Sequence, residues 1–360
     1  MKLLDLFSGI GGFHLGLEQS GFKFDWVGFS EIDKFASQQY KRRFPNATEL
    51  GDITSVRARE LPNDITILCG GFPCQAFSIA GKREGFNDTR GTLFFEIARI
   101  LRYFKGIGKP IPYFILENVK GLLNHDNGQT FATIYRVLAD LDYTIECQLL
   151  NTRWFLPQNR ERIYIVGHLG ERGRAKIFPI GKNDRKINKS RRNNIMISAA
   201  PGREFGWKKI SPTLYSRDYK DPKLVKVADY RNDEGLRIRE DGNSPCLTSS
   251  KNSETELSRM SPLIMPVLTP NRAEKRQNGR RFKEDGEDMF TLTSQDQHGV
   301  KINSNIRRLT PTECERLQGF PDGWTEEQSD TQRYKQLGNA VSVPVVKVVG
   351  DQIIKMIGKL

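Results

Sequence analysis

The first 168 residues alternate short apolar runs with amphipathic segments, and this alternation constrains the fold more than any other feature of the chain. The apolar runs are typical of buried strands: Leu3–Phe7, Trp26–Phe29, Ile65–Cys69, Tyr113–Leu116, Thr144–Leu150 and Ile163–Val166. The segments between them are typical of helices: Phe13–Gln19, Lys34–Phe44, Leu93–Phe104 and Thr130–Leu141. Strands that alternate with helices form a largely parallel sheet with helices on both faces. The sequence therefore predicts a doubly wound α/β fold.

The pattern changes near Gly170 and becomes basic, rich in Asn, Ser, Gly and Pro, and free of helical periodicity. Residues 169–306 hold 28 Lys and Arg against 18 Asp and Glu, and 171–209 alone hold 12 against 3. Such a segregated positive segment is typical of a surface that binds a polyanion, although a solvated basic face is the alternative. Three similar segments recur at 211–214, 244–247 and 289–292. We predict a smaller, irregular β-rich domain over 171–325 rather than a disordered linker. It follows a first domain over 1–170. A C-terminal segment over 326–360 returns to the first domain.

The remaining composition narrows the class of protein. The five cysteines are an odd number without paired spacing, which favours reduced thiols in a cytoplasmic compartment over a disulfide framework or a zinc ribbon. No apolar run approaches the roughly 20 residues of a membrane helix. The N-terminus reaches Asp5 almost at once, so we expect no signal peptide.

The first strand leads into a loop that contains Gly9, Gly11 and Gly12. Glycines at a strand-to-helix turn let a ligand approach the backbone and the free N–H groups of the helix. The dinucleotide pattern G-x-G-x-x-G fails here, because His14 occupies its last glycine position. Glu31 ends the second strand, where an acid can accept hydrogen bonds from ribose hydroxyls. The loop favours a nucleoside ligand without a diphosphate, such as S-adenosylmethionine, over a purely structural turn.

Three further motifs border predicted strands: the first follows a strand at the edge where α/β proteins place their sites, the second ends a strand at the same edge, and the third precedes Ile163–Val166. Cys74 stands in Gly-Gly-Phe-Pro-Cys-Gln, Glu117 in Phe-Ile-Leu-Glu-Asn-Val, and Arg160 and Arg162 in Gln-Asn-Arg-Glu-Arg. Strand alternation puts both arginines on one face, where they can hold an anionic or carbonyl-rich group. Each motif alone has a plainer interpretation: a buried thiol, a solvated acid or a surface ion pair. Together they predict a nucleophile beside an acid and two cations.

In this order the motifs resemble the blocks of the DNA cytosine-5 methyltransferase family. Residues 308–321 and 334–341 resemble its later blocks, so that the likeness covers nearly all of 1–168 and 307–346. The resemblance implies a Rossmann-like S-adenosylmethionine-dependent methyltransferase fold, with a catalytic domain at 1–170 and a target-recognition domain at 171–325.

The resemblance also implies which residues contact S-adenosylmethionine: Phe7, Gly9, Ile10, Gly11, Gly12, Glu31, Ile32, Asp52, Ile53, Pro73, Leu93, Asn339 and Val341. Ile32 departs from the family pattern, which often has Trp beside the ribose-binding acid. Adenine stacking at this position must therefore be weaker or come from elsewhere.

The catalytic residues implied by the family are Cys74, Glu117, Arg162 and, as a neighbouring support, Arg160. Cys74 would add to carbon 6 of a flipped-out cytosine, while Glu117 and Arg162 hold its ring nitrogen and its carbonyl. Residues 78–92 resemble the mobile active-site loop. DNA contacts are expected from this loop and from the recognition domain: Gln75, Ser78, Lys82, Arg90, Thr213, Leu214, Thr291 and Leu292.

The expected partner is double-stranded DNA, with no metal and no membrane, and the family default is a monomer. A restriction–modification context is expected, with any companion restriction endonuclease encoded nearby but not bound. Three alternatives remain: an RNA (tRNA) cytosine-5 methyltransferase, a catalytically dead DNA-binding paralogue and a nicotinamide dehydrogenase. The long basic segment and Gln75 disfavour the first, the intact Cys74, Glu117 and Arg162 the second, and the broken glycine pattern the third.

Overall fold

A computed structural model describes most of the chain. The described residues are 1–73, 93–169, 177–181, 194–198, 224–231, 235–238, 264–268, 270, 280–284, 286–294, 296–302 and 305–358. The helices are α1 (Gly12–Gln19), α2 (Lys34–Arg43), α3 (Phe94–Gly106), α4 (Gln129–Ala139), α5 (Pro311–Gln318), α6 (Asp330–Asn339) and α7 (Val343–Ile357). Short 3-10 turns are η1 (Ile53–Ser55), η2 (Ala58–Glu60), η3 (Lys120–Leu123), η4 (His125–Gly128) and η5 (Thr152–Trp154).

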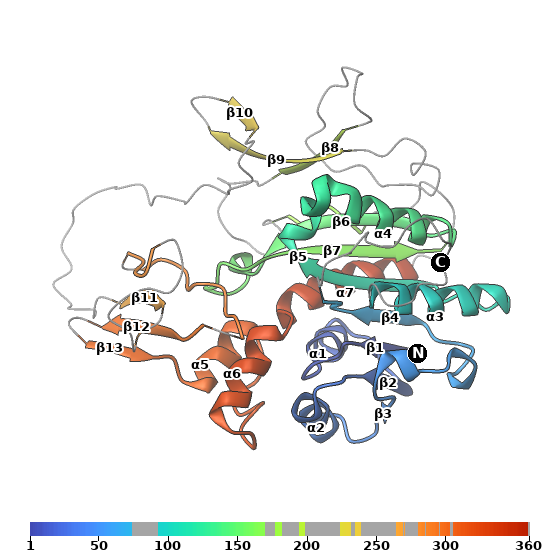
Figure 1. Ribbon diagram of the computed structural model, residues 1–360, viewed down its shortest axis with the longest axis horizontal. Coiled ribbons are helices and arrows are strands. Elements are labelled where there is room, and N and C mark those ends of the chain that lie inside the picture. Colours follow the sequence, from blue (N-terminus) through green and yellow to red (C-terminus); the bar gives the residue numbers. More distant parts are fainter. Residues whose placement is uncertain are drawn as a thin grey trace.

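The first domain contains a seven-stranded sheet (Figure 1). Its strands are β1 (Lys2–Leu6), β2 (Trp26–Ser30), β3 (Thr48–Glu49), β4 (Ile67–Gly70), β5 (Tyr113–Val119), β6 (Thr144–Asn151) and β7 (Glu161–His168), in the spatial order β3-β2-β1-β4-β5-β7-β6. All neighbours are parallel except β7, which runs antiparallel to β5 and β6. The predicted, largely parallel sheet is confirmed, and the two-residue strand β3 is an addition to it.

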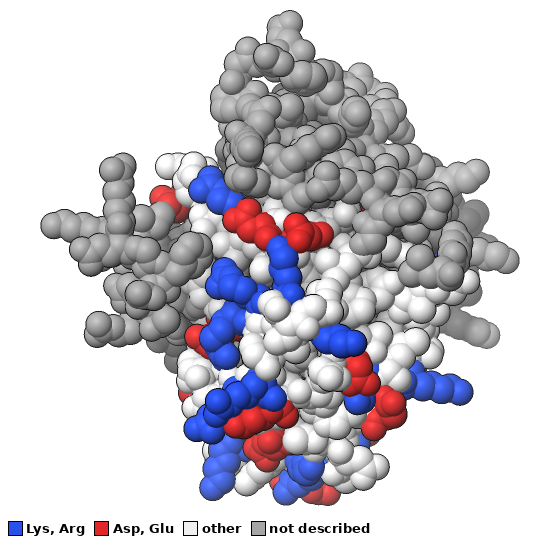
Figure 2. Space-filling view, turned by 90° about the vertical axis from the view of Figure 1, so that its right-hand side faces the viewer, with Lys and Arg blue, Asp and Glu red and all other residues white. Residues whose placement is uncertain are grey.

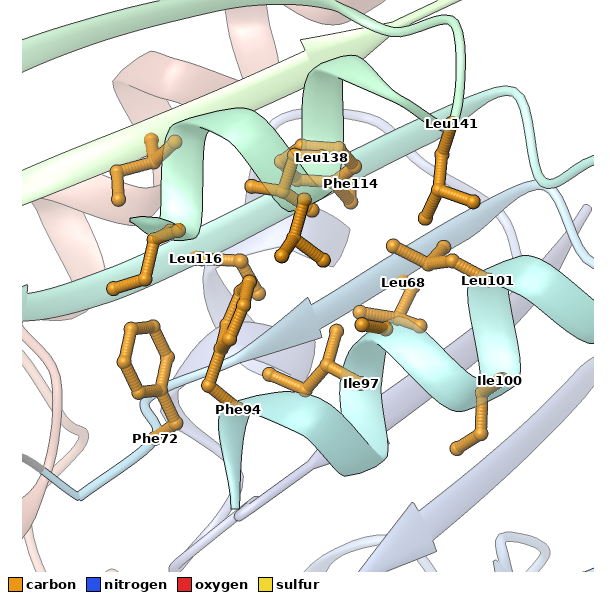
Figure 3. Close-up of a cluster of buried hydrophobic side chains, with 14 of the residues drawn as sticks. Leu68, Phe72, Phe94, Ile97, Ile100, Leu101, Phe114, Leu116, Leu138 and Leu141 are labelled. Atoms are coloured by element: carbon orange, nitrogen blue, oxygen red, sulfur yellow. The ribbon is translucent and has the colours of Figure 1, made fainter. Parts of the chain in front are cut away.

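Helices cover both faces of this sheet because successive strand residues point to opposite sides. Leu4 and Leu6 of β1 join the cluster under α3 and α4, whereas Leu3 joins the cluster under α1 and α7. Figure 3 shows the first cluster, in which side chains of β4 and β5 meet those of α3 and α4. Two apolar layers therefore fix the sheet and leave its carboxyl edge to be shaped by loops.

A third cluster joins the C-terminal part of the chain to the first domain. Trp324, Leu337 and Val343 pack there with Ile10 and Ala36. The indole Nε1 of Trp324 donates to the carbonyl of Ile10 over 3.0 Å. The predicted domain boundary after residue 325 thus falls inside one packed cluster.

The described parts of 171–325 contain two small antiparallel sheets. One has the order β10-β9-β8, with β8 (Asn194–Ser198), β9 (Leu224–Arg231) and β10 (Gly235–Ile238). The other has the order β11-β12-β13, with β11 (Ile264–Leu268), β12 (His298–Ile302) and β13 (Asn305–Arg308), and lies beside α5 and α6 (Figure 1). These sheets agree with the predicted β-rich character.

On the face shown in Figure 2, acidic and basic side chains of the described residues are interspersed, whereas the sequence concentrates its positive excess in 169–306. Cys69, Cys147 and Cys314, the cysteines within the described ranges, are buried and free. None of the described helices is long and apolar enough to cross a membrane.

Candidate active site

The carboxyl ends of β1, β2, β4 and β5 meet at one edge of the sheet and line a cavity of about 520 Å³. Every residue predicted to contact the cofactor lines this cavity, except Gly11, Gly12 and Val341. Glu117, Arg160 and Arg162 also line it. The predicted cofactor and catalytic groups of the described chain therefore share one cavity, whose two parts we call the cofactor end, around Glu31, and the base end, around Glu117.

The glycine loop after β1 takes an unusual backbone path. Phe7, Gly9 and Gly11 have φ angles of 53°, 54° and 86°, in the left-handed region that side chains with a Cβ rarely adopt. A Cβ on Gly9 would meet no atom within 4 Å, so this residue borders open space. A Cβ on Gly11 would lie 2.5 Å from the ring of Phe44, and one on Gly12 would lie 2.7 Å from Val341. Gly11, Gly12 and Val341 thus pack behind the loop instead of lining the cavity.

Glu31 is fixed by the backbone on both sides of its carboxylate. Its Oε2 accepts from the Gly9 N–H and its Oε1 from the Asp33 N–H, each over 2.8 Å. Burial raises the pKa of Glu31 above its ordinary value. Each carboxylate oxygen has two lone pairs, so both can still accept from a ligand hydroxyl.

Asp33 follows Glu31 and lines the same cavity. Its Oδ1 accepts from the backbone N–H groups of Phe35 and Ala36, which caps the N-terminus of α2. Its Oδ2 accepts from Lys335 Nζ of α6 over 2.5 Å. Burial alone would raise the pKa of Asp33, but the hydrogen bonds from Lys335, Ala36 and Phe35 outweigh burial and lower it.

The other residues of the cofactor end differ in exposure. Ile53 is buried, and Asp52 caps the turn η1 by accepting from the Thr54 N–H over 2.9 Å. Ile32 is 79% exposed at the rim. Because so little protein packs on Ile32, it offers one aliphatic surface to a ligand and no stacking ring.

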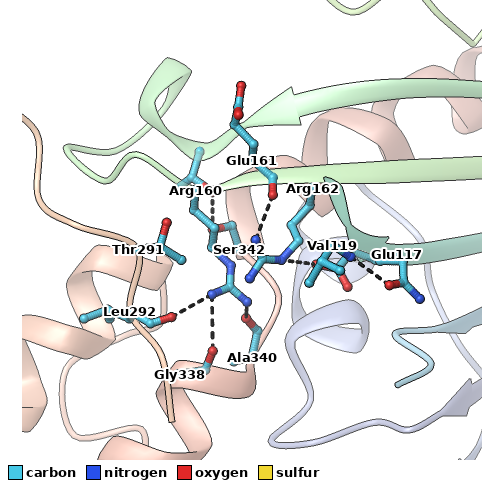
Figure 4. A network of polar contacts seen from close by, with 12 residues as sticks. Glu117, Val119, Arg160, Glu161, Arg162, Thr291, Leu292, Gly338, Ala340 and Ser342 are labelled. Carbon is cyan, nitrogen blue, oxygen red and sulfur yellow. Dashed lines mark hydrogen bonds and ion pairs between the residues drawn. The ribbon is translucent and has the colours of Figure 1, made fainter. Parts of the chain in front are cut away.

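The base end is built from β5 and β7. Glu117 lies near the end of β5 and is buried, and its Oε1 lies 3.1 Å from Arg162 Nε. This is an ion-pair distance, yet Oε1 has no hydrogen bond from the described residues. Arg162 NH1 also donates to the Glu161 carbonyl over 2.7 Å. A buried carboxylate and a guanidinium therefore face the cavity side by side (Figure 4).

Asn118 anchors the start of the loop that carries the predicted nucleophile. Its Nδ2 donates to the Phe72 carbonyl over 2.9 Å, and the Phe72 side chain is buried. Pro73 follows and lines the cavity with Glu117. Cys74 is the next residue and lies outside the described residues, as do Gln75, Ser78, Lys82, Arg90, Thr213 and Leu214.

Arg160 is 3% exposed and its guanidinium binds backbone carbonyls from two distant segments (Figure 4). NH1 donates to Leu292 over 2.9 Å and to Gly338 over 3.2 Å, and NH2 donates to Ala340 over 2.9 Å. Burial lowers the pKa of Arg160 to about 10. The carbonyl-rich group that the sequence predicted for this arginine is thus protein backbone, which makes Arg160 a support for the site.

Thr291 and Leu292, both predicted to contact DNA, lie against the same segment as Arg160. The Thr291 hydroxyl donates to the Asn159 carbonyl. Leu292 is 2% exposed and packs in the third cluster. The Leu292 side chain therefore packs within the protein, and its contact with DNA stays a prediction.

Several residues that line the cavity were not predicted from the sequence. Lys335 and Gln336 belong to the block 334–341, of which only Asn339 and Val341 were assigned. The role of Asp33 as a helix cap could have been predicted from the sequence, since an acid before a helical segment is typical of an N-cap. The contact of Lys335 with Asp33 could not be predicted from local sequence, because these residues are far apart in the chain.

Comparison with known proteins agrees with this geometry. The model of the family described as "C-5 cytosine-specific DNA methylase" matches residues 1–355. The chain belongs to this family. The orphan methyltransferase M.SPRI of Bacillus phage SPR is 33% identical over 98% of this chain and 97% of its own length. The type II methyltransferase M1.ScrFI of Lactococcus lactis subsp. cremoris is 37% identical over 99% of this chain and 79% of its own length.

Solved structures support the fold assignment. A Dnmt2 methyltransferase of S. pombe superimposes with a TM-score of 0.62 at 19% identity, over 99% of each chain. A putative DNA modification methyltransferase encoded within an E. coli prophage gives a TM-score of 0.53 at 17% identity, again over 99% of each chain. At these identities the likeness concerns the fold, and the Rossmann-like methyltransferase fold predicted from the sequence is confirmed.

Proposed function

We propose that this protein transfers a methyl group from S-adenosylmethionine to carbon 5 of a flipped-out cytosine in a specific short site of duplex DNA, through a covalent adduct with Cys74. The observation that carries the proposal is the shared cavity. Glu31 and the glycine loop form its cofactor end, Glu117 and Arg162 form its base end, and Pro73, directly before Cys74, lines it too.

The cofactor end suits a nucleoside with an amino-acid tail. The whole cavity, at about 520 Å³, falls within the roughly 300–1,000 Å³ of small-molecule sites. Glu31 keeps lone pairs for ribose hydroxyls, and the open space at Gly9 lets a ligand reach the backbone. When bound, S-adenosylmethionine supplies a methyl group on a sulfonium, which is a strong electrophile.

Carbon 5 of cytosine is too weak a nucleophile to accept this methyl group unaided. Cys74, as a thiolate, would form a bond to carbon 6, and the ring electrons would shift so that carbon 5 becomes enamine-like and nucleophilic. After methylation, loss of the carbon 5 proton would expel the thiolate and restore the ring. The base for that last step is a water molecule or an unassigned group of the site.

Glu117 and Arg162 would hold the edge of the base. A protonated Glu117 would donate to ring nitrogen 3, so that negative charge does not accumulate when the thiolate adds. Arg162 would donate to the ring carbonyl. The Glu117–Arg162 contact already orients both groups toward the cavity.

The direct test is a methylation assay with labelled S-adenosylmethionine on duplex DNA and, in parallel, on tRNA. We expect label at carbon 5 of cytosine in the duplex and none in tRNA. Bisulfite sequencing of DNA from cells that express the gene would then identify the site. Methylation of tRNA but not of duplex DNA would refute the proposal and favour an RNA cytosine-5 methyltransferase.

The target-recognition role belongs to residues 170–306 in this proposal. The basic run 171–209 would contact phosphates, which position a duplex but carry no sequence information. A plot of the logarithm of the DNA-binding constant against the logarithm of salt concentration should become less steep, by about 0.9 in slope for each Lys or Arg neutralised there. Exchange of 170–306 with a relative of different specificity should exchange the site. An active chimera that keeps the original site would locate recognition in the first domain.

The relatives named above also suggest the biological setting. We propose that the protein acts as a monomer in a restriction–modification or phage context, and that a companion endonuclease, where one is encoded, does not bind it. Size-exclusion chromatography with light scattering, with and without DNA, tests the monomer.

A further inference from the structure

One ion pair in the wall of the cavity has no role in the mechanism above. Lys335 of α6 and Asp33 at the start of α2 are 302 positions apart and meet over 2.5 Å between Nζ and Oδ2. Both residues line the cavity, and their side chains are 47% and 24% exposed. We call this pair the Asp33–Lys335 clasp.

The clasp connects the two walls that would hold the cofactor. On one wall, the Asp33 N–H donates to Glu31, the residue proposed to bind the ribose. On the other wall, Lys335 lies one helical turn before Asn339, which lines the cavity at the end of α6. A rearrangement that separates α6 from the start of α2 would therefore have to break this ion pair.

A second ion pair joins the same two parts of the chain outside the cavity. Arg42, near the end of α2, lies 2.8 Å from Glu327, just before α6. Neither residue lines the active-site cavity. Arg42 lines a neighbouring hollow that Glu31 and Ile32 also line, whereas Glu327 lines neither that hollow nor the active-site cavity. Glu327→Gln therefore provides a matched control, because it removes a charged tie between α2 and the C-terminal segment away from the cofactor end.

We propose that the Asp33–Lys335 clasp retains the cofactor: it holds the wall that carries Glu31 against the wall that carries Asn339 and slows cofactor dissociation. Asp33 and Lys335 are then positioning residues, because they act through the neighbours that contact the ligand. The inference rests on the proposed use of S-adenosylmethionine.

The variants separate the charge of the clasp from its other contacts. Asp33→Asn keeps a side-chain oxygen that can cap α2 and removes the charge. Lys335→Met keeps most of the aliphatic stem and removes the cation. Lys335→Arg keeps the cation. The double variant Asp33→Asn/Lys335→Met shows whether the two residues act as one unit.

The measurement is the dissociation rate of labelled S-adenosylmethionine from the full-length protein, chased with excess S-adenosylhomocysteine. A partly exposed ion pair predicts a rate about two- to fivefold faster in Lys335→Met and Asp33→Asn. The double variant should release the cofactor no faster than either single variant, and Lys335→Arg should release it at close to the wild-type rate. The difference in rate between wild type and the charge-removing variants should shrink as salt rises toward about 1 M. The control variant Glu327→Gln should release the cofactor at the wild-type rate.

Two results would overturn the proposal. An unchanged rate in Lys335→Met would show that the clasp does not retain the cofactor. An equal acceleration in Glu327→Gln would show that any tie between α2 and the C-terminal segment suffices. Wild-type protein that binds no S-adenosylmethionine would instead refute the proposed function, and this outcome is visible before any variant is compared.

Discussion

The two ends of the cavity hold their carboxylates in different ways. Glu31 at the cofactor end is bound by two backbone N–H groups, from Gly9 and Asp33. Glu117 at the base end faces a side-chain partner, Arg162, and its Oε1 accepts no hydrogen bond from the described residues. Burying an acceptor that has no hydrogen bond costs free energy, unless a ligand donates a hydrogen bond to it.

This difference suggests a division of labour. Because backbone donors move only with the fold, Glu31 is held in place without a ligand. At the base end, Glu117 Oε1 still lacks a hydrogen bond among the described residues, and an extruded base would supply one. Variants at the base end should therefore change chemistry, and variants at the cofactor end should change affinity.

The largest effect is expected at Cys74. Cys74→Ala should abolish methyl transfer, because the proposed bond to carbon 6 requires its thiolate, and should leave DNA binding largely intact. DNA with 5-fluorocytosine should trap a covalent complex with the wild type only, since fluorine cannot leave carbon 5 as a proton does. Substantial turnover by the variant would refute the covalent mechanism.

Glu117→Gln should lower the single-turnover rate of methyl transfer by about 10²- to 10⁴-fold, the usual contribution of general acid–base catalysis. Cofactor affinity, measured by calorimetry, should remain at the wild-type value, because Glu117 lies at the other end of the cavity. An equal loss of cofactor affinity would show that the two ends are not separate. Thermal unfolding of the variant checks that the lost ion pair with Arg162 has not destabilised the fold.

Base extrusion predicts an effect on DNA binding. In a stacked duplex, neighbouring bases block the perpendicular approach of Cys74, so the cytosine must rotate out at a few kcal/mol. A mismatch at the target has already lost part of that stability. Binding should tighten by about 1–3 kcal/mol, roughly 5- to 150-fold, and should do so in Cys74→Ala as well. Equal affinities in competition binding of matched and mismatched duplexes would exclude base opening from the binding equilibrium.

At the cofactor end, Glu31→Ala should weaken S-adenosylmethionine binding by about ten- to a hundredfold, since a charge-assisted hydrogen bond contributes roughly 1.5–3 kcal/mol. Glu49→Gln is the matched control, because Glu49 lies on the neighbouring strand β3 and does not line the active-site cavity. Calorimetry gives both affinities. An unchanged value for Glu31→Ala would place the ribose contact elsewhere.

The sequence by itself determined the elements and the edge at which the site lies. Apolar runs and helical periodicity gave most strands and helices of 1–168 within three residues of their observed ends. Glu31 and Glu117 each lie at or near a strand end, and parallel strand ends share one edge of a sheet. These features follow from local patterns of burial, which a single sequence records.

Only the tertiary structure decided the strand order, the reversed direction of β7 and the partners of the site residues. Arg160 was predicted as a neighbouring support, and only the structure shows that it donates to the carbonyls of Leu292, Gly338 and Ala340. Leu292 was predicted to contact DNA, and only the structure shows that its side chain packs in the third cluster. Such contacts join segments more than 100 residues apart, and they depend on how packed layers meet rather than on any local preference of the chain.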